Sequence, residues 1–282
     1  MIHECIPVTA PGSGEIGYLY LYFLESSEEM RPREKRPVIL MCPGGGYAMT
    51  SDREAEPMAM QFLAMGYHVA ILRYSVAPAR YPTALYQLAE SVLWLKRYAD
   101  RNHIDPDRII LQGCSAGGHL AASYGVAWQE PFLAKAVAAR PEQLRVAGLL
   151  LCYPVITSGE KAHRESFENL LGDRYGELRE ELSLERRVTA QTPPTFLWHT
   201  AVDDTVPVEN SLYFFEALLA NGVSAELHIY PVGGHGLSLA NEETCRSNGI
   251  GVQKECQSWI RLAETWLESL CGDGDGRSRR GF

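Results

Sequence analysis

Short apolar runs recur along the chain and are separated by longer segments of mixed polarity. Most of these runs are apolar throughout rather than alternating, which is typical of strands that are covered on both faces. The sequence therefore predicts buried strands of a parallel sheet at residues 37–42, 67–74, 108–113, 146–152, 194–200 and 225–230.

The segments between these runs carry helical periodicity. Leu85, Leu88, Val92 and Leu95 recur at the spacing of one helix face. A second helix is expected to end at Gly222, where a C-terminal cap belongs, and a third is expected over 252–270. Strands that alternate with helices predict a mostly parallel sheet with helices on both faces, the α/β class.

The N-terminal part has a different pattern. Residues 17–24 alternate aromatic and aliphatic side chains, which predicts a strand that begins the sheet as part of an antiparallel pair. Residues 12–17 read G-x-G-x-x-G, but they lead into this strand instead of following one, so a hairpin turn is favoured over a dinucleotide site. Residues 43–46, Pro-Gly-Gly-Gly, lack the G-K-[ST] ending of a phosphate-binding loop.

Composition narrows the class of protein. The 282 residues are 46% hydrophobic and 22% charged, which is ordinary for a globular protein with a substantial core. A net charge of −9 without a basic stripe argues against nucleic acid as a partner. The chain contains no run of 18 apolar residues, so no membrane-spanning helix is predicted. No secretory signal is visible, and the seven cysteines, two of them within apolar runs (Cys42 and Cys152), predict reduced thiols in a cytoplasmic protein.

The predicted organisation is one domain over residues 1–271. The polar, weakly helical segment 157–188 is the one obvious insertion and a candidate small lid, and the glycine-rich, charged tail 272–282 is expected to be disordered. The chain has no H-E-x-x-H and no C-x-x-C, so neither a metal nor another cofactor is expected.

Residues 113–117 read G-C-S-A-G between a predicted strand and a predicted helix over 116–127. In such a sharp turn the central residue is strained and side chains two positions to either side would collide, so glycines belong there. Glycines flank Ser115 at this spacing, whereas Cys114 has Gln112 and Ala116. We therefore predict Ser115 as the nucleophile and Cys114 as a buried apolar filler.

A serine nucleophile needs a base, and the base needs an acid to orient it. Asp203 follows one predicted strand and His235 follows the next, which gives the chain order Ser, Asp, His. Asp203 is favoured over Asp204, which would begin the turn toward Pro207.

Other histidines compete for the role of base. His119 is expected to pack or form hydrogen bonds near the serine turn. His199 and His228 lie within predicted strands and are expected to be buried polar groups with partners.

A glycine-rich loop follows the strand at 37–42. Consecutive glycines let backbone N–H groups face a ligand, so we predict oxyanion donors at Gly45, Gly46 and Ala116. Tyr47 could stack on a substrate sugar ring or simply close the loop, and the sequence leaves both roles open.

These motifs together resemble α/β-hydrolase serine esterases of the hormone-sensitive-lipase-like type, and among them bacterial acetyl esterases that act on acetylated xylan and other carbohydrates. The similarity covers about residues 15–270 and depends on CPGGGYAMTSDREAEPMA, LRYSVAPARYP, IDPDRIILQGCSAGGHLAA, PPTFLWHTAVDDTVPVENS and YPVGGHGLSL. It implies the α/β-hydrolase fold, with Ser115, Asp203 and His235 as the catalytic residues. Pro43 stands where many relatives have histidine, and the N-terminal part is too short for a helical cap, so a small or absent cap and an open site are expected.

The resulting functional expectation is a serine carboxylesterase that hydrolyses short-chain acyl esters and removes O-acetyl groups from acetylated sugars or xylo-oligosaccharides. The alternatives are a peptidase or amidase with the same three residues and a non-catalytic binding protein of this fold. A homo-oligomer stays open.

Overall fold

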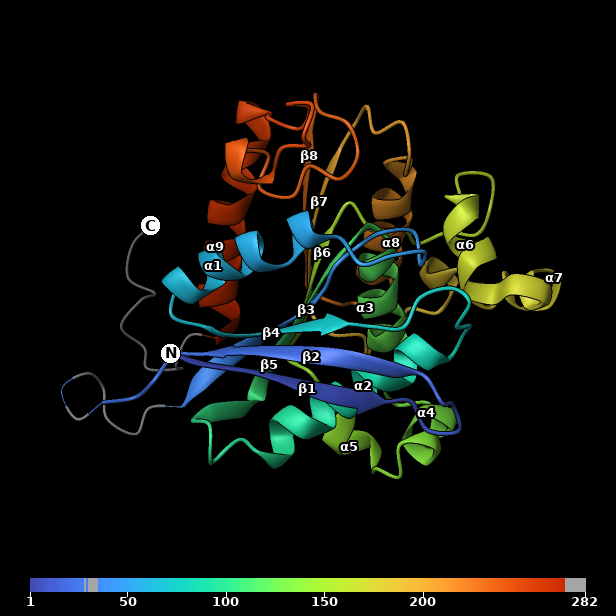
Figure 1. The fold of residues 1–282 in the computed structure, drawn as a ribbon. Helices are drawn as coiled ribbons and strands as arrows, with labels where there is room; N and C mark the ends of the chain where they lie inside the picture. Colours follow the sequence, from blue (N-terminus) through green and yellow to red (C-terminus); the bar gives the residue numbers. More distant parts are fainter. Residues whose placement is uncertain (28, 30–34, 272–282) are drawn as a thin grey trace.

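The computed structural model describes residues 1–27, 29 and 35–271. Its centre is one eight-stranded sheet in the order β1-β2-β4-β3-β5-β6-β7-β8 (Figure 1). The strands are β1 (Ile2–Thr9), β2 (Ile16–Phe23), β3 (Arg36–Cys42), β4 (His68–Arg73), β5 (Ile104–Cys114), β6 (Gly148–Cys152), β7 (Thr195–Thr200) and β8 (Ala225–Tyr230).

The sheet has an antiparallel end and a parallel remainder. β1 and β2 form a hairpin in which Thr9 pairs with Ile16, and β2 is antiparallel to β4. All pairs from β4 through β8 are parallel. The prediction that 17–24 belongs to an antiparallel pair is therefore confirmed, and so is the hairpin turn, where Gly12 has a φ of +74°.

Helices cover both faces of the sheet, as predicted (Figure 1). α1 (Glu56–Ala64) and α9 (Trp259–Cys271) pack on one face, and α2 (Thr83–Arg97), α3 (Ser115–Ala127) and α8 (Glu209–Ala220) pack on the other. Shorter elements complete the described chain: α4 (Pro131–Ala136), α5 (Pro141–Leu144), α6 (Arg164–Leu171), α7 (Tyr175–Leu178) and the 3₁₀ turns η1 (Asp52–Glu54), η2 (Gly172–Arg174), η3 (Leu184–Arg186), η4 (Glu242–Thr244) and η5 (Lys254–Ser258).

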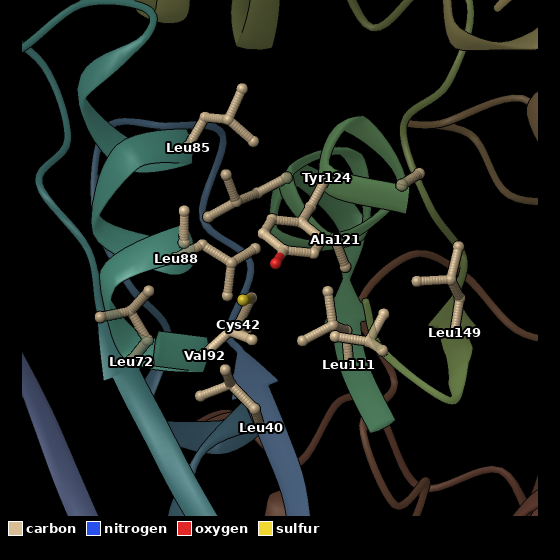
Figure 2. Packing of buried hydrophobic residues seen from close by; sticks show 14 of the residues in the cluster. Leu40, Cys42, Leu72, Leu85, Leu88, Val92, Leu111, Ala121, Tyr124 and Leu149 are labelled. Carbon is tan, nitrogen blue, oxygen red and sulfur yellow. The ribbon is translucent and has the colours of Figure 1, made fainter. Parts of the chain in front are cut away.

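The apolar runs of the strands supply the core. On the α2–α3 face, Leu40, Leu111 and Leu149 from three parallel strands meet Leu88 of α2 and Tyr124 of α3 (Figure 2). All five side chains are fully buried. The Tyr124 hydroxyl retains a partner there, since it donates a hydrogen bond to the carbonyl oxygen of Leu144 at 2.6 Å.

Several boundaries differ from the sequence prediction. The predicted helix at 252–270 is two elements, because the 3₁₀ turn η5 precedes α9 and the regular helix begins only at Trp259. β1 and α1 were absent from the prediction; β1 is an edge strand with several exposed polar side chains, so it lacks the apolar run that marked the others. The predicted disordered tail, 272–282, lies outside the described residues.

Among the helices of the described residues, none has the length and apolar character needed to span a bilayer. The seven cysteines are all free thiols, and four of them, Cys42, Cys114, Cys152 and Cys256, are fully buried.

The parallel strands determine where the predicted site residues gather. β3, β5, β7 and β8 run in the same direction, so the segments that follow them leave the sheet at the same edge. The glycine loop, Ser115, Asp203 and His235 each come directly after one of these strands. Ligands of open α/β sheets bind at this edge.

Candidate active site

Ser115 occupies the turn between β5 and α3 with a φ of +52°, a conformation that non-glycine residues rarely adopt. The flanking glycines are required by space. A Cβ at Gly113 would lie 2.3 Å from the carbonyl oxygen of Gly117, and a Cβ at Gly117 would lie 2.0 Å from that of Cys42. These contacts confirm the steric role predicted for the two glycines, since the turn cannot close with side chains at either position.

Three predicted side chains form a continuous hydrogen-bonded chain. Ser115 Oγ lies 2.8 Å from His235 Nε2, and His235 Nδ1 lies 2.7 Å from Asp203 Oδ2. With Nδ1 donating to the carboxylate, Nε2 is left to accept the serine proton. The structure thus brings together residues 120 and 32 positions apart in the sequence.

Asp203 is held in place by the main chain as well as by histidine. Its Oδ1 accepts hydrogen bonds from the N–H groups of Thr205 at 3.0 Å and Val206 at 2.9 Å. Burial by itself raises the pKa of this carboxyl group, but hydrogen bonds from His199, His235 and Val206 outweigh burial and hold the pKa below its usual range. Asp203 is therefore an ionised partner for His235 down to strongly acidic pH.

The neighbours of these residues have other roles. Cys114 is fully buried, as predicted, and burial raises the pKa of its thiol well above the ordinary value, which makes it a poor nucleophile. Asp204 is exposed, and its Oδ1 lies 3.3 Å from the hydroxyl of Thr205. Within the described chain, no cluster of His, Cys, Asp and Glu has the makeup of a metal site.

The glycine loop presents main chain to Ser115. Gly45 and Gly46 have φ values of +128° and +63°. Neither N–H group of these two residues donates a hydrogen bond within the part of the chain that the structure describes. The N–H of Ala116 is in the first turn of α3, where a helix has no internal acceptor. The three N–H groups predicted as oxyanion donors thus have no acceptor among the described residues.

Tyr47 closes the glycine loop. Its side chain is only 2% exposed, and its hydroxyl lies 2.9 Å from His119 Nδ1. The ring packs edge-on against both Tyr74 and His119. A ring this deeply buried has no free face for a sugar, so the structure favours the loop-closing role over the substrate-binding one.

The remaining histidines only partly match expectation. His119 does pack behind the serine turn, and its Nε2 lies 3.1 Å from the carbonyl oxygen of Leu182. His199 is fully buried, with Nδ1 2.8 Å from Ser211 Oγ and Nε2 3.2 Å from Asp203 Oδ2. The prediction that His228 is buried is wrong: β8 is the outermost strand, and the side chain is 29% exposed beside Glu226.

Sequence reasoning missed the link between His199 and the acid. His199 Nε2 also lies 2.9 Å from the carbonyl oxygen of Val206, so its N–H is shared between that carbonyl and Asp203. The available signal was the separation of four residues between His199 and Asp203 across the end of β7. This separation indicated that the two residues lie near each other but not that their side chains are in contact.

The insertion lies against the glycine loop. Asn169 of α6 donates a hydrogen bond to the carbonyl oxygen of Gly46 at 2.9 Å. At the start of the insertion, the buried Asn210 side chain accepts hydrogen bonds from the N–H groups of Ile156 at 2.8 Å and Thr157 at 3.0 Å. In Figure 1, α6 and α7 project from the α8 side of the molecule.

The sheet order, the strained serine turn and the position of the histidine and acid after neighbouring strands define an α/β-hydrolase. Comparison with protein families agrees. A model of the BD-FAE family matches residues 27–218, and the chain belongs to that family. The resemblance to esterases drawn from the motifs is thereby confirmed.

Known proteins give the same result. The chain is similar to an acetyl ester-xyloside bifunctional hydrolase from Caldicellulosiruptor lactoaceticus, with 36% identity, a TM-score of 0.78, and coverage of 91% of this chain and 89% of that structure. It is also similar to a carboxylesterase from Lactobacillus plantarum, with 29% identity, a TM-score of 0.84, and coverage of 97% and 100%.

A curated relative is Endo-1,4-beta-xylanase B from Butyrivibrio fibrisolvens, which is 35% identical over 221 residues, 74% of this chain and 34% of the relative. The chain spans about a third to about half of the length of the first curated relatives that it matches.

Proposed function

We propose that the protein is a serine carboxylesterase that hydrolyses short acyl esters, above all acetyl esters of sugars such as xylo-oligosaccharides. The observation that carries the proposal is the hydrogen-bonded chain of Ser115, His235 and Asp203, with distances of 2.8 and 2.7 Å. Acetyl as the acyl group is supported by the similarity to an acetyl ester-xyloside hydrolase.

In the acylation step, Ser115 Oγ attacks the acyl carbon and its proton passes to His235 Nε2. The ionised Asp203 stabilises the imidazolium that results. The tetrahedral oxyanion accepts hydrogen bonds from the N–H groups of Gly45, Gly46 and Ala116, and one such donor contributes about 3–4 kcal/mol to the transition state. Collapse of the intermediate breaks the ester bond, and the departing alcohol takes the proton from His235.

In the deacylation step, His235 removes a proton from water, which attacks the acyl-serine. The same N–H groups hold the second oxyanion. Its collapse returns the proton to Ser115 and releases the carboxylic acid, so ester and water give alcohol and acid with no cofactor consumed.

The insertion supports a further element of this proposal. Because Asn169 bonds the carbonyl oxygen of Gly46, α6 forms a wall next to the oxyanion donors. We assign to this segment the role of limiting the acyl or alcohol group, in place of the larger cap of other hydrolases. The seven free thiols are consistent with a cytoplasmic protein.

The test is a substrate panel with two matched variants. The wild-type protein is assayed with p-nitrophenyl esters of increasing acyl length, an acetylated xylo-oligosaccharide and a peptide anilide. We expect turnover to be highest for acetyl esters and to fall by at least about 10⁴-fold in Ser115→Ala. Cys114→Ala, which changes the adjacent buried thiol, should retain most of the activity.

Two outcomes would contradict the proposal. Ester turnover that survives Ser115→Ala would remove the serine from the mechanism. Faster cleavage of the anilide than of any ester would favour the peptidase alternative.

A further inference from the structure

A buried carboxyl group lies directly behind the glycine loop. Glu54, at the end of η1, is only 4% exposed. Both of its oxygens accept hydrogen bonds, the pattern expected of a carboxylate: Oε2 from the N–H of Gly44 at 2.8 Å, and Oε1 from the hydroxyl of Tyr153 at 2.8 Å. Within the described chain, no Lys, Arg or His forms an ion pair with it. A buried carboxyl group without a counter-ion is costly, so these two donors carry its stabilisation.

The first of these contacts fixes the start of the glycine loop. Because the N–H of Gly44 is bonded to Glu54, it points away from the substrate side, and the next two N–H groups, of Gly45 and Gly46, remain without an acceptor. The packing around Gly44 is tight: a Cβ there would lie 2.7 Å from Glu54 Oε2 and 2.9 Å from Ser115 Cβ. Glu54, Gly44 and the serine turn are therefore in direct contact.

The second contact reaches the loop that carries the histidine. The Tyr153 hydroxyl that donates to Glu54 also accepts a hydrogen bond from the N–H of Ser238 at 3.0 Å. The ring of Tyr153 packs edge-on against the imidazole of His235, with 5.2 Å between the ring centres. Two hydrogen bonds through the Tyr153 hydroxyl thus connect Glu54 to Ser238, which follows the histidine by three positions.

Arg53, the residue before Glu54, contacts the same loop. Its Nη2 donates to the carbonyl oxygen of Gly236 at 2.8 Å, and its own carbonyl oxygen accepts from the hydroxyl of Ser238 at 2.6 Å. A third bond joins its Nε to the carbonyl oxygen of Thr244 at 2.6 Å. Two consecutive residues of η1 therefore contact both the glycine loop and the histidine loop.

We propose that Glu54 is a positioning residue that sets the oxyanion donors of the glycine loop and the loop of His235 in register with Ser115. The inference rests on the proposed esterase function and adds to it a residue that touches no substrate. Its effect passes through Gly44 on one side and Tyr153 on the other. Since small displacements of a reacting group or an oxyanion donor slow the chemical step, the expected loss lies in kcat rather than in KM.

The main test is Glu54→Gln, which preserves shape but cannot accept hydrogen bonds at both positions. We expect kcat to fall by about 10- to 100-fold with KM changed by less than about threefold. The matched control is Glu56→Gln, two residues later on α1, whose exposed carboxyl group bonds the Tyr22 hydroxyl away from both loops. It should leave kcat unchanged.

A second readout separates positioning from folding. The rate at which a fluorophosphonate forms a covalent bond to Ser115, followed by mass spectrometry of the intact protein, depends on the serine, the base and the oxyanion donors but not on any natural ester. We expect this rate to fall in parallel with kcat in Glu54→Gln, at a temperature where circular dichroism shows the variant fully folded. An unchanged rate and an unchanged kcat would overturn the inference.

Tyr153→Phe provides the comparison if Glu54→Gln fails to fold. It keeps the ring against His235 and removes only the hydroxyl that joins Glu54 to Ser238. We expect a smaller decrease, about 3- to 30-fold in kcat and in fluorophosphonate rate, and wild-type values for both would overturn the inference. If wild-type protein reacts with fluorophosphonate but turns over no ester, the esterase proposal fails, while the rates of these variants still decide the role of Glu54.

Discussion

The two sides of Ser115 are built in different ways. On one side, His235 and Asp203 act through side chains, and hydrogen bonds of 2.7 to 3.0 Å fix their orientation. On the other side, Gly45 and Gly46 would act, in the proposed mechanism, through main-chain N–H groups; both have positive φ values, and Gly45 has no room for a Cβ atom. A change of chemical type should therefore damage the first side, and a change of shape should damage the second.

The largest effect is expected at the acid. In Asp203→Asn the amide oxygen takes the position that accepts from the Thr205 and Val206 N–H groups, so the NH2 group faces His235 Nδ1 and donates where the carboxylate accepted. The base is then held in the wrong tautomer, and kcat should fall by about 10³–10⁴-fold. Asp204→Asn is the matched control, because that neighbouring carboxyl group is exposed and accepts a hydrogen bond from the Thr205 hydroxyl. Steady-state kinetics of both variants measure the difference. Equal losses in the two would show that Asp203 has no special role.

The second effect concerns shape on the oxyanion side. Gly45→Ala puts a Cβ at a φ of +128° and 2.3 Å from the carbonyl oxygen of Met49, so the loop must move and kcat should fall by about 10²–10³-fold. Gly234→Ala is the control from the histidine loop, where no neighbouring atom of the described residues lies within 4 Å of the added Cβ. It should change kcat by less than about threefold, although it neighbours His235. If activity survives Gly45→Ala, the oxyanion donors must be other groups than those of this loop.

This contrast also explains what could be predicted from the sequence. Glycines at 113 and 117 and in the 44–46 run reveal backbone shape directly, because few other constraints require glycine at such positions. The position of Ser115, Asp203 and His235 at one edge of a parallel sheet follows from the alternation of apolar runs with helices. Both kinds of information are local in the sequence.

The supports of the site are not local. Glu54 is one glutamate among many in the sequence, and only the folded chain shows that its two oxygens meet Gly44 and Tyr153. In the sequence, nothing distinguishes His199 from other polar residues of buried strands, and only the structure shows that it lies beside Asp203. The role of Tyr47 likewise could be assigned only once its burial was known, and the spacing of residues in the sequence does not reveal burial.

His199 tests whether the acid needs side-chain support beyond His235. His199→Phe keeps a ring of similar size but removes the N–H that lies 3.2 Å from Asp203 and 2.9 Å from the Val206 carbonyl oxygen. Loss of a hydrogen bond to a charged group costs about 1.5–3 kcal/mol, so kcat should fall by about 10- to 100-fold. His228→Phe, in the adjacent strand, is the control and should have wild-type kcat. The same kcat in both variants would mean that His199 does not orient Asp203 and that, apart from His235, only main-chain N–H groups do so.

The smallest expected effect is on stability, because lowering the pH should affect the two sides of Ser115 over different pH ranges. Burial lowers the pKa of His119, whose imidazole bonds the Tyr47 hydroxyl behind the glycine loop, from 6.5 to about 4. At a pH between these two pKa values, His119 is protonated in the unfolded chain but not in the folded chain. The free energy of unfolding therefore decreases as the pH falls through this range. Between pH 7 and pH 5 the decrease from this group is about 2 kcal/mol.

Asp203 also loses its contribution to stability in acid, but over a lower pH range. Its pKa is held below the usual 3.8, so its contribution to stability is intact at pH 5 and is lost only in stronger acid. Acid should therefore weaken the oxyanion side first. Urea unfolding at pH 7 and pH 5 measures this, and His119→Gln should lose less stability over that interval than the wild-type protein by about 2 kcal/mol. An identical decrease in the two proteins would mean that the buried imidazole is not the group that titrates.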